Sequence, residues 1–174
     1  GIEFALLHVT SMYPTPYEKV RLGALQQLSE NFSDAVIGLS DHSIGNYSCF
    51  AAVSLGASIL EKHFTSNKNW PGPDIPISLD PLELKDLIIG SKAVFKALGG
   101  NKEILSEEQP TIDFAYSSVV SIKDIKKGDL FNNENIWVKR PGTGEIRAKD
   151  FKKILNCCAK TNIEKNCQIK WDMI

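Results

Sequence analysis

The sequence predicts an α/β protein with a parallel sheet covered by helices, followed by a smaller and mostly β second domain. Apolar runs alternate with amphipathic stretches over residues 1–100, which is the pattern of strands and helices in a parallel α/β fold. The apolar runs are continuous, as is typical of strands buried on both faces. Residues 115–174 instead contain short Ser- and Val-rich runs separated by turn sequences, which favour a small β domain.

Within the first hundred residues, an expected strand is followed by an expected helix three times over. The strands are apolar runs, and the helices have apolar residues at intervals of three or four. The last helix begins at Pro81 and ends before the glycine pair at 99 and 100, which are favoured helix boundaries. The expected strands are 4–9, 35–39 and 57–60, and the expected helices are 17–31, 46–55 and 81–98.

The remainder of the chain begins with a polar stretch at 101–114, which we interpret as a linker. Beyond it, turn-rich sequences at 126–129 and 140–144 separate the candidate elements. We expect strands at 116–122, 136–139 and 168–171 and a short helix at 148–155.

Composition limits the classes of partner. The 174 residues include 20 Lys and Arg against 21 Asp and Glu, a formal net charge of −1. Such a balance lacks the basic surface that nucleic acids and anionic membranes attract, and no apolar run approaches the roughly 18 to 20 residues of a membrane span. The four cysteines show no Cys-x-x-Cys spacing, so we expect reduced, structural thiols and a cytoplasmic protein.

Polar residues follow each of the three expected strands, at the edge where parallel α/β proteins build their active sites. His42 and His63 each come just after such a strand. Because neighbouring strands lie about 4.8 Å apart, the two imidazoles can share one divalent metal, with water and substrate oxygens as further ligands. The alternative is two hydrogen-bonded structural histidines. His8 lies inside a strand, so we expect it to be structural.

Other candidate residues, at this edge and in the second domain, have two interpretations each. Ser11 and Ser40 can donate hydrogen bonds to a phosphate or carboxylate, or cap the strand ends. Asp74 can exchange a proton with a substrate, or belong to an ordinary turn. Lys62 is either a phosphate contact or a solvated strand end. Arg140 suits a carboxylate or amide oxygen, although a plain surface charge fits the same pattern.

Taken together, five stretches of the chain resemble the sialic acid synthase family. Members of that family make nine-carbon sugar acids, the nonulosonates, from phosphoenolpyruvate and an N-acyl hexose. The resemblance runs in order along nearly the whole chain, and Ser-Asp-His followed by Glu-Lys-His-Phe-Thr is its most specific part. The five stretches are LHVTSMYPTP (7–16), GLSDHS (38–43), EKHFT (61–65), GPD (72–74) and KRPGTG (139–144).

For the fold, the resemblance implies the C-terminal portion of a (β/α)8 TIM barrel followed by a small antifreeze-like, or SAF, domain with a β-clip fold. Residues 1–100 would be the last three β/α units of the barrel, 101–114 the linker and 115–174 the SAF domain. Three units cannot close an eight-stranded barrel. We therefore expect an exposed first strand, and a chain that is part of a longer enzyme or a truncated reading frame and is inactive alone.

For the site, the resemblance implies that His42 and His63 hold a divalent metal, manganese or magnesium. It also implies that Asp74 acts on the acceptor sugar and that Arg140 enters the barrel of a partner subunit, which makes the active homodimer domain-swapped. Ser11 stands where some members have Asn, so this phosphoenolpyruvate contact is expected to be shortened or lost. The remaining implied substrate contacts are Ser40 for phosphoenolpyruvate, and Tyr13 and Phe114 for the sugar.

The function expected from this resemblance is a transferase reaction. Phosphoenolpyruvate condenses with N-acetylmannosamine or a related sugar to give a sialic-acid-like product and phosphate. Two other interpretations stay open on sequence alone. One is a non-catalytic, SAF-containing fragment that binds sugar or promotes dimerisation. The other is an unrelated metal-dependent aldolase or lyase built on a barrel.

Overall fold

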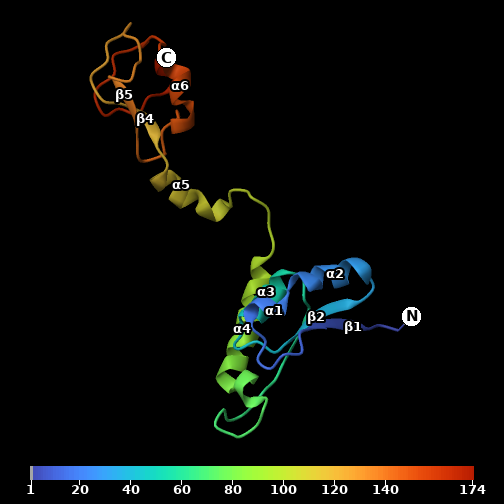
Figure 1. Ribbon diagram of the computed structural model, residues 1–174. Helices are drawn as coiled ribbons and strands as arrows, with labels where there is room; N and C mark the ends of the chain where they lie inside the picture. The colour runs from blue at the N-terminus through green and yellow to red at the C-terminus, as the bar shows by residue number, and fades with distance from the viewer. Residues whose placement is uncertain (1) are drawn as a thin grey trace. The chain divides into compact units, whose positions relative to one another are not determined.

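The computed structural model describes residues 2–174 and divides between Asn101 and Lys102 into two compact units (Figure 1). The first unit holds a parallel sheet with its helices. The second holds a smaller, mostly irregular domain with a two-stranded sheet. An α/β first unit is therefore confirmed. The expectation of a mostly β second domain holds only for its two-stranded sheet, since the rest of that unit is short helices, turns and irregular segments.

The first unit is built on three parallel strands in the order β1-β2-β3. These are β1 (Ala5–Val9), β2 (Val36–Asp41) and β3 (Ile59–Lys62). The central strand β2 thus lies between the two edge strands, and the carboxyl ends of all three point the same way. The predicted third strand, 57–60, is displaced by two residues because Ala57 closes the end of the preceding helix through a bond from its N–H to the Ala52 carbonyl oxygen.

Four helices connect and cover these strands: α1 (Tyr17–Val20), α2 (Gly23–Asn31), α3 (Tyr47–Ser54) and α4 (Pro81–Ala97). The single helix predicted over 17–31 is wrong in one respect, since Arg21 adopts a left-handed conformation with φ of 56° and separates α1 from α2. The other two helices are confirmed. Asp80 caps α4 by accepting hydrogen bonds from the N–H groups of Leu82 and Glu83.

The sheet is covered on one side only. Ile37 and Leu39 of β2 pack into one cluster with Leu25 of α2, Ala52 of α3 and Leu87 of α4. We call this side of the sheet the helix side and the opposite one the open side. Alternation along the strands places other residues on the open side, and of these Val9, Val36 and Ile59 are 43%, 46% and 38% exposed. The expectation of burial on both faces is therefore wrong for the described residues.

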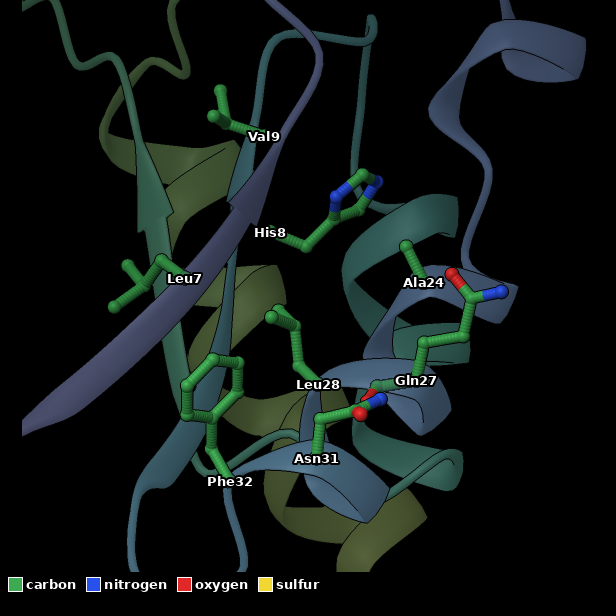
Figure 2. Close-up of a pocket in the computed structure, with 8 residues that line it drawn as sticks. All are labelled: Leu7, His8, Val9, Ala24, Gln27, Leu28, Asn31 and Phe32. Atoms are coloured by element: carbon green, nitrogen blue, oxygen red, sulfur yellow. The ribbon is translucent and has the colours of Figure 1, made fainter.

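The free edge of β1 is also open, as expected for the first strand. Figure 2 shows a pocket between β1 and α2, lined by residues that include His8, Leu28 and Phe32. Nε2 of His8 lies 2.7 Å from the carbonyl oxygen of Val20, so this ring joins β1 to α1, in agreement with a structural role. None of the strand-end residues that follow β2 and β3 line this pocket.

In the second unit, β4 (Ser118–Ser121) pairs antiparallel with β5 (Ile136–Lys139). The short helices are α5 (Gln109–Ala115) and α6 (Phe151–Ile154). The stretch expected as a linker is thus partly helical. The strand predicted at 168–171 is wrong, because Gln168 forms only an isolated bridge with Val120 and Trp171–Met173 is a 3-10 turn. A separate core fills this unit, built from Val119, Ile125, Phe131, Ile136, Ile146, Ile154, Ala159, Ile163 and Ile169.

Two further observations concern the chain as a whole. In the part of the chain that the structure describes, every helix is too short or too polar to cross a membrane. All four cysteines are free, as predicted, and Cys49 is fully buried in the first unit.

Candidate active site

Three aromatic rings meet at the carboxyl ends of the parallel strands. The ring centroids of His42 and His63 lie 5.3 Å apart. The ring of Tyr13 packs over His42 at a centroid distance of 4.2 Å and meets His63 edge-on at 5.8 Å. The expectation that His42 and His63 come together is therefore confirmed, and Tyr13 joins them from the loop after β1.

Backbone groups hold both histidines in place. Nδ1 of His42 lies 3.0 Å from the carbonyl oxygen of Thr10, and because a carbonyl can only accept, Nδ1 carries the proton. The carbonyl oxygen of His42 accepts from Thr15 N at 3.0 Å, and that of His63 accepts from Leu79 N at 2.8 Å. His42 is only 7% exposed, and its imidazole is tied to the residue that follows β1.

The carboxylate of Asp74 approaches this ring cluster. Its Oδ2 lies 3.8 Å from Nδ1 of His63, and the two side chains are 55% and 33% exposed. The loop that carries Asp74 is anchored because Ser78 donates both its N–H and its hydroxyl to the Asp74 carbonyl oxygen. Asp74 is therefore positioned to orient His63 or to meet a substrate from solvent.

The two imidazoles suit a pair of metal ligands better than a complete protein cage. Among residues 2–174, no group of three or more His, Cys, Asp and Glu side chains is arranged to hold a metal ion. In His42, the protonated Nδ1 bonds a backbone carbonyl, which leaves Nε2 as the nitrogen that can coordinate. This is the usual arrangement of a metal-binding histidine. The residues fit a two-histidine site whose other positions are filled by water or substrate.

The two predicted serines of the site, Ser40 and Ser11, lie in different surroundings. Oγ of Ser40 donates to Oε1 of Glu61 at 2.7 Å, on the open side of the sheet. Ser11 is exposed in the loop after β1, and the neighbouring hydroxyl of Thr10 is used locally as a donor to the Lys19 carbonyl oxygen. Glu61 is not among the residues predicted from the sequence. It lies directly opposite Ser40 in the register of β2 and β3, which places the two side chains next to each other.

Lys62 matches neither of its two predicted roles. Its Nζ lies 3.0 Å from Oδ2 of Asp41, and the two side chains are only 3% and 1% exposed. Both residues share the helix side with Leu39. Burial, followed by the charge of Asp41, raises the pKa of the nearby Cys49 thiol to about 12, so this thiol is a neutral donor to Asp41. Lys62 is thus part of a buried ion pair.

Phe114 and Arg140 belong to the second unit. Phe114 lies in α5 with 72% of its surface exposed, and Arg140 is exposed directly after β5. The loop that begins at Arg140 is held by Ser118, whose hydroxyl donates to the Pro141 carbonyl oxygen at 3.0 Å and accepts from Gly144 N at 2.8 Å. Both side chains are available to a ligand or partner, and their roles stay predictions.

Comparison with known proteins identifies the family. Residues 1–103 match the NeuB family, and residues 116–174 match the SAF domain. The chain belongs to the NeuB family. The resemblance to sialic acid synthases drawn from the five sequence stretches is therefore confirmed over both parts of the chain.

Relatives of this NeuB-family chain include named sugar acid synthases. It is 42% identical over 162 residues to the N,N'-diacetyllegionaminic acid synthase of Campylobacter jejuni, covering 92% of the chain and 48% of that protein. It is 35% identical over 158 residues to the N-acetylneuraminate-9-phosphate synthase of Homo sapiens, covering 90% and 43%. The chain spans about half the length of the curated relatives it matches.

A solved structure shows the same fold. The spore coat polysaccharide biosynthesis protein of Bacillus subtilis matches with a TM-score of 0.52 and 32% identity, over 98% of this chain and 52% of that one. Only about half of the solved structure is thus represented in this NeuB-family chain.

Proposed function

We propose that this chain contributes the metal-binding end of a nonulosonate synthase. The reaction condenses phosphoenolpyruvate with an N-acyl hexose, such as N-acetylmannosamine, to give a nine-carbon sugar acid and phosphate. The observation that carries the proposal is the pair of imidazoles 5.3 Å apart at the carboxyl ends of β2 and β3, in a chain whose family includes legionaminic acid and N-acetylneuraminate-9-phosphate synthases.

The sheet supports a place in a (β/α)8 barrel. Helices α2, α3 and α4 all contribute to the core on the helix side, while valine and isoleucine side chains of all three strands are exposed on the open side. In a barrel, that second face lines the interior and is filled by side chains of the other strands. We infer that further β/α units cover the open side and pair with β1 in the active enzyme.

His42, through its Nε2 atom, and His63 would hold the divalent metal, manganese or magnesium. When bound, such an ion polarises a carbonyl or phosphoryl oxygen, which lowers the energy of a transition state by several kcal/mol. Imidazole ligands are shared by several first-row metals, so the choice of ion follows from the remaining ligands and its availability.

The chain's own residues supply orientation and proton transfer. The carbon–carbon bond forms when the enol carbon of phosphoenolpyruvate attacks the sugar aldehyde, water then adds to the resulting cation, and phosphate leaves by C–O cleavage. The exposed carboxylate of Asp74 accepts a hydrogen bond or a proton from a sugar hydroxyl. The ring of Tyr13 packs against both imidazoles and restricts their orientation. The Ser40 hydroxyl donates to Glu61 in this structure, and it would donate to phosphoenolpyruvate instead when that substrate binds.

The second unit is assigned to the partner side of the site. We propose a domain-swapped homodimer in which Arg140 enters the barrel of the partner subunit, and we propose Phe114 as an aromatic contact on the acceptor sugar. Arg140 is exposed on an anchored loop, which suits a guanidinium that must reach a carboxylate or amide oxygen outside its own unit. The four free cysteines agree with a cytoplasmic enzyme.

The test measures phosphate release from phosphoenolpyruvate with N-acetylmannosamine or its diacetamido relatives, with manganese and with EDTA. It uses this chain alone and a fusion that adds the part of the Campylobacter jejuni synthase that the chain does not match. Manganese-dependent release by the fusion, abolished by replacing both histidines with alanine, supports the proposal. A folded fusion that binds sugar without releasing phosphate supports the non-catalytic alternative.

A further inference from the structure

Directly behind the two imidazoles lies a buried ion pair that the proposed chemistry does not use. Asp41 immediately precedes His42, and Lys62 immediately precedes His63. The two are opposite each other in the β2–β3 register, and their side chains join at 3.0 Å on the helix side of the sheet. Each charge therefore belongs to the residue next to one of the two histidines.

Stability alone does not account for this pair. Removing two charges from water carries a penalty that their attraction often fails to recover, and well-packed apolar residues of similar volume are commonly as stable or more so. The pair is deeply buried, because the Cys49 thiol that donates to Asp41 and the Ser43 residue that bonds both charges are each fully buried. A pair retained in such a place suggests a geometric role.

The hydrogen bonds of the pair act on both sides of His42. Oδ1 of Asp41 accepts from Ser43 N at 2.9 Å, and Oδ2 accepts from Ser43 Oγ at 3.0 Å. Nζ of Lys62 donates to the Ser43 carbonyl oxygen as well as to Asp41. The residues before and after His42 are thus both tied to the residue before His63.

We propose that Asp41 and Lys62 are positioning residues that set the separation of the two imidazoles. The pair links the ends of β2 and β3 behind the site, and it fixes the backbone on which His42 and His63 stand. Its loss lets the two strand ends move independently, so that the imidazoles no longer meet a single ion in one geometry. This inference rests on the proposed metal-binding function of the same two histidines.

The test replaces both charges at once, because a single replacement leaves an uncompensated buried charge and risks unfolding. The variant Asp41→Asn/Lys62→Met removes the ion pair at similar volume. The control Lys68→Met makes the same lysine substitution in the Lys68–Glu83 pair, whose side chains are 39% and 38% exposed. Manganese affinity is measured by calorimetry on the full chain, and thermal unfolding reports whether each variant is folded.

We expect the double variant to stay folded and to bind manganese about 10 to 100 times more weakly, the range found when groups that orient metal ligands are removed. The control should stay within twofold of the starting chain. A folded double variant with unchanged affinity overturns the positioning role.

A second measurement separates this inference from the proposed function. If the starting chain binds no manganese, the metal assignment fails, but the spacing of the imidazoles is still measurable in the metal-free chain by NMR contacts between ring protons of His42 and His63. Loss of those contacts in the folded double variant supports the positioning role. Their persistence unchanged refutes it.

Discussion

Gly38 lies in the middle of the central strand, where the two neighbouring strands leave no room for a side chain. A Cβ at this position would lie 2.7 Å from the carbonyl oxygen of Ile59, 2.9 Å from its Cβ and 3.0 Å from Cγ of Leu7. The nearest of these atoms belongs to the backbone of β3. Gly38→Ala therefore fits only if β2 and β3 move apart, and those are the strands that carry His42 and His63.

The expected cost combines two opposing effects. Overpacking a position with such close neighbours destabilises by about 1–3 kcal/mol, whereas alanine in place of a strand glycine recovers about 0.5–1 kcal/mol of chain entropy. Because the clash involves a backbone oxygen rather than a flexible side chain, we expect a net loss of about 1–2.5 kcal/mol. With a urea dependence of about 1–3 kcal/mol per molar, a loss of this size lowers the unfolding midpoint by about 0.3–2.5 M.

The assay must report on the first unit alone, since the two units can unfold separately. Cys49 provides the probe, because its thiol is fully buried there and is labelled only when that unit opens. Labelling of Cys49 against urea concentration, read by mass spectrometry, gives the free energy of unfolding. Gly23→Ala is the matched control, since a Cβ there meets no atom within 4 Å.

The control should leave the unfolding free energy unchanged or raise it by up to about 1 kcal/mol, the helix propensity difference between glycine and alanine. Gly38→Ala should also weaken manganese binding, because the strand ends are displaced. A Gly38→Ala chain at least as stable as the starting chain would refute the packing argument.

Three further predictions follow from single side chains. The pKa of Cys49 is raised from an ordinary 9.0 to about 12, so this thiol should react with a disulfide reagent at pH 8 only on unfolding. The exposed Cys158 should react at once. Rapid labelling of both cysteines would contradict this prediction. His63→Ala in the fusion enzyme should abolish manganese-dependent phosphate release with little change in thermal unfolding, since the side chain is one-third exposed, and near-normal turnover would remove its role. Asp80→Ala should lower the urea stability of the first unit by about 0.5–2 kcal/mol through loss of the α4 cap, and an unchanged midpoint would show that the cap contributes nothing.

Much of the first unit could be predicted because its signals are local. Continuous apolar runs predict the parallel strands, and Pro81 predicts the start of α4. The break between α1 and α2 at Arg21 could not be predicted, because nothing in the residue type requires a left-handed conformation. One-sided burial also escaped, since the sequence reports which strands are apolar but not whether the atoms that cover them belong to the same chain.

The second unit was harder to predict for a physical reason. Much of this unit is joined by isolated bridges such as Ile125 with Ile163 and Leu130 with Cys158, rather than by long strands. Such pairings join residues far apart in sequence and leave no periodic pattern. Gln168 therefore looks like part of a strand in sequence, yet it forms a single bridge before the chain turns.

The site shows where a pattern of residue types is sufficient and where it is not. His42 and His63 were paired correctly because adjacent parallel strands must end at one edge. Lys62 was assigned to solvent or phosphate because a lysine at a strand end is most often exposed. The alternation of side chains along the strands predicts its position better. Lys62 is two residues after Leu60, and Asp41 is two residues after Leu39, so both charged side chains lie on the helix side of the sheet. Two opposite charges buried in the same core must pair. Because each member of this pair directly precedes one of the two histidines, we infer that buried residues, rather than surface residues, determine the spacing of the imidazoles.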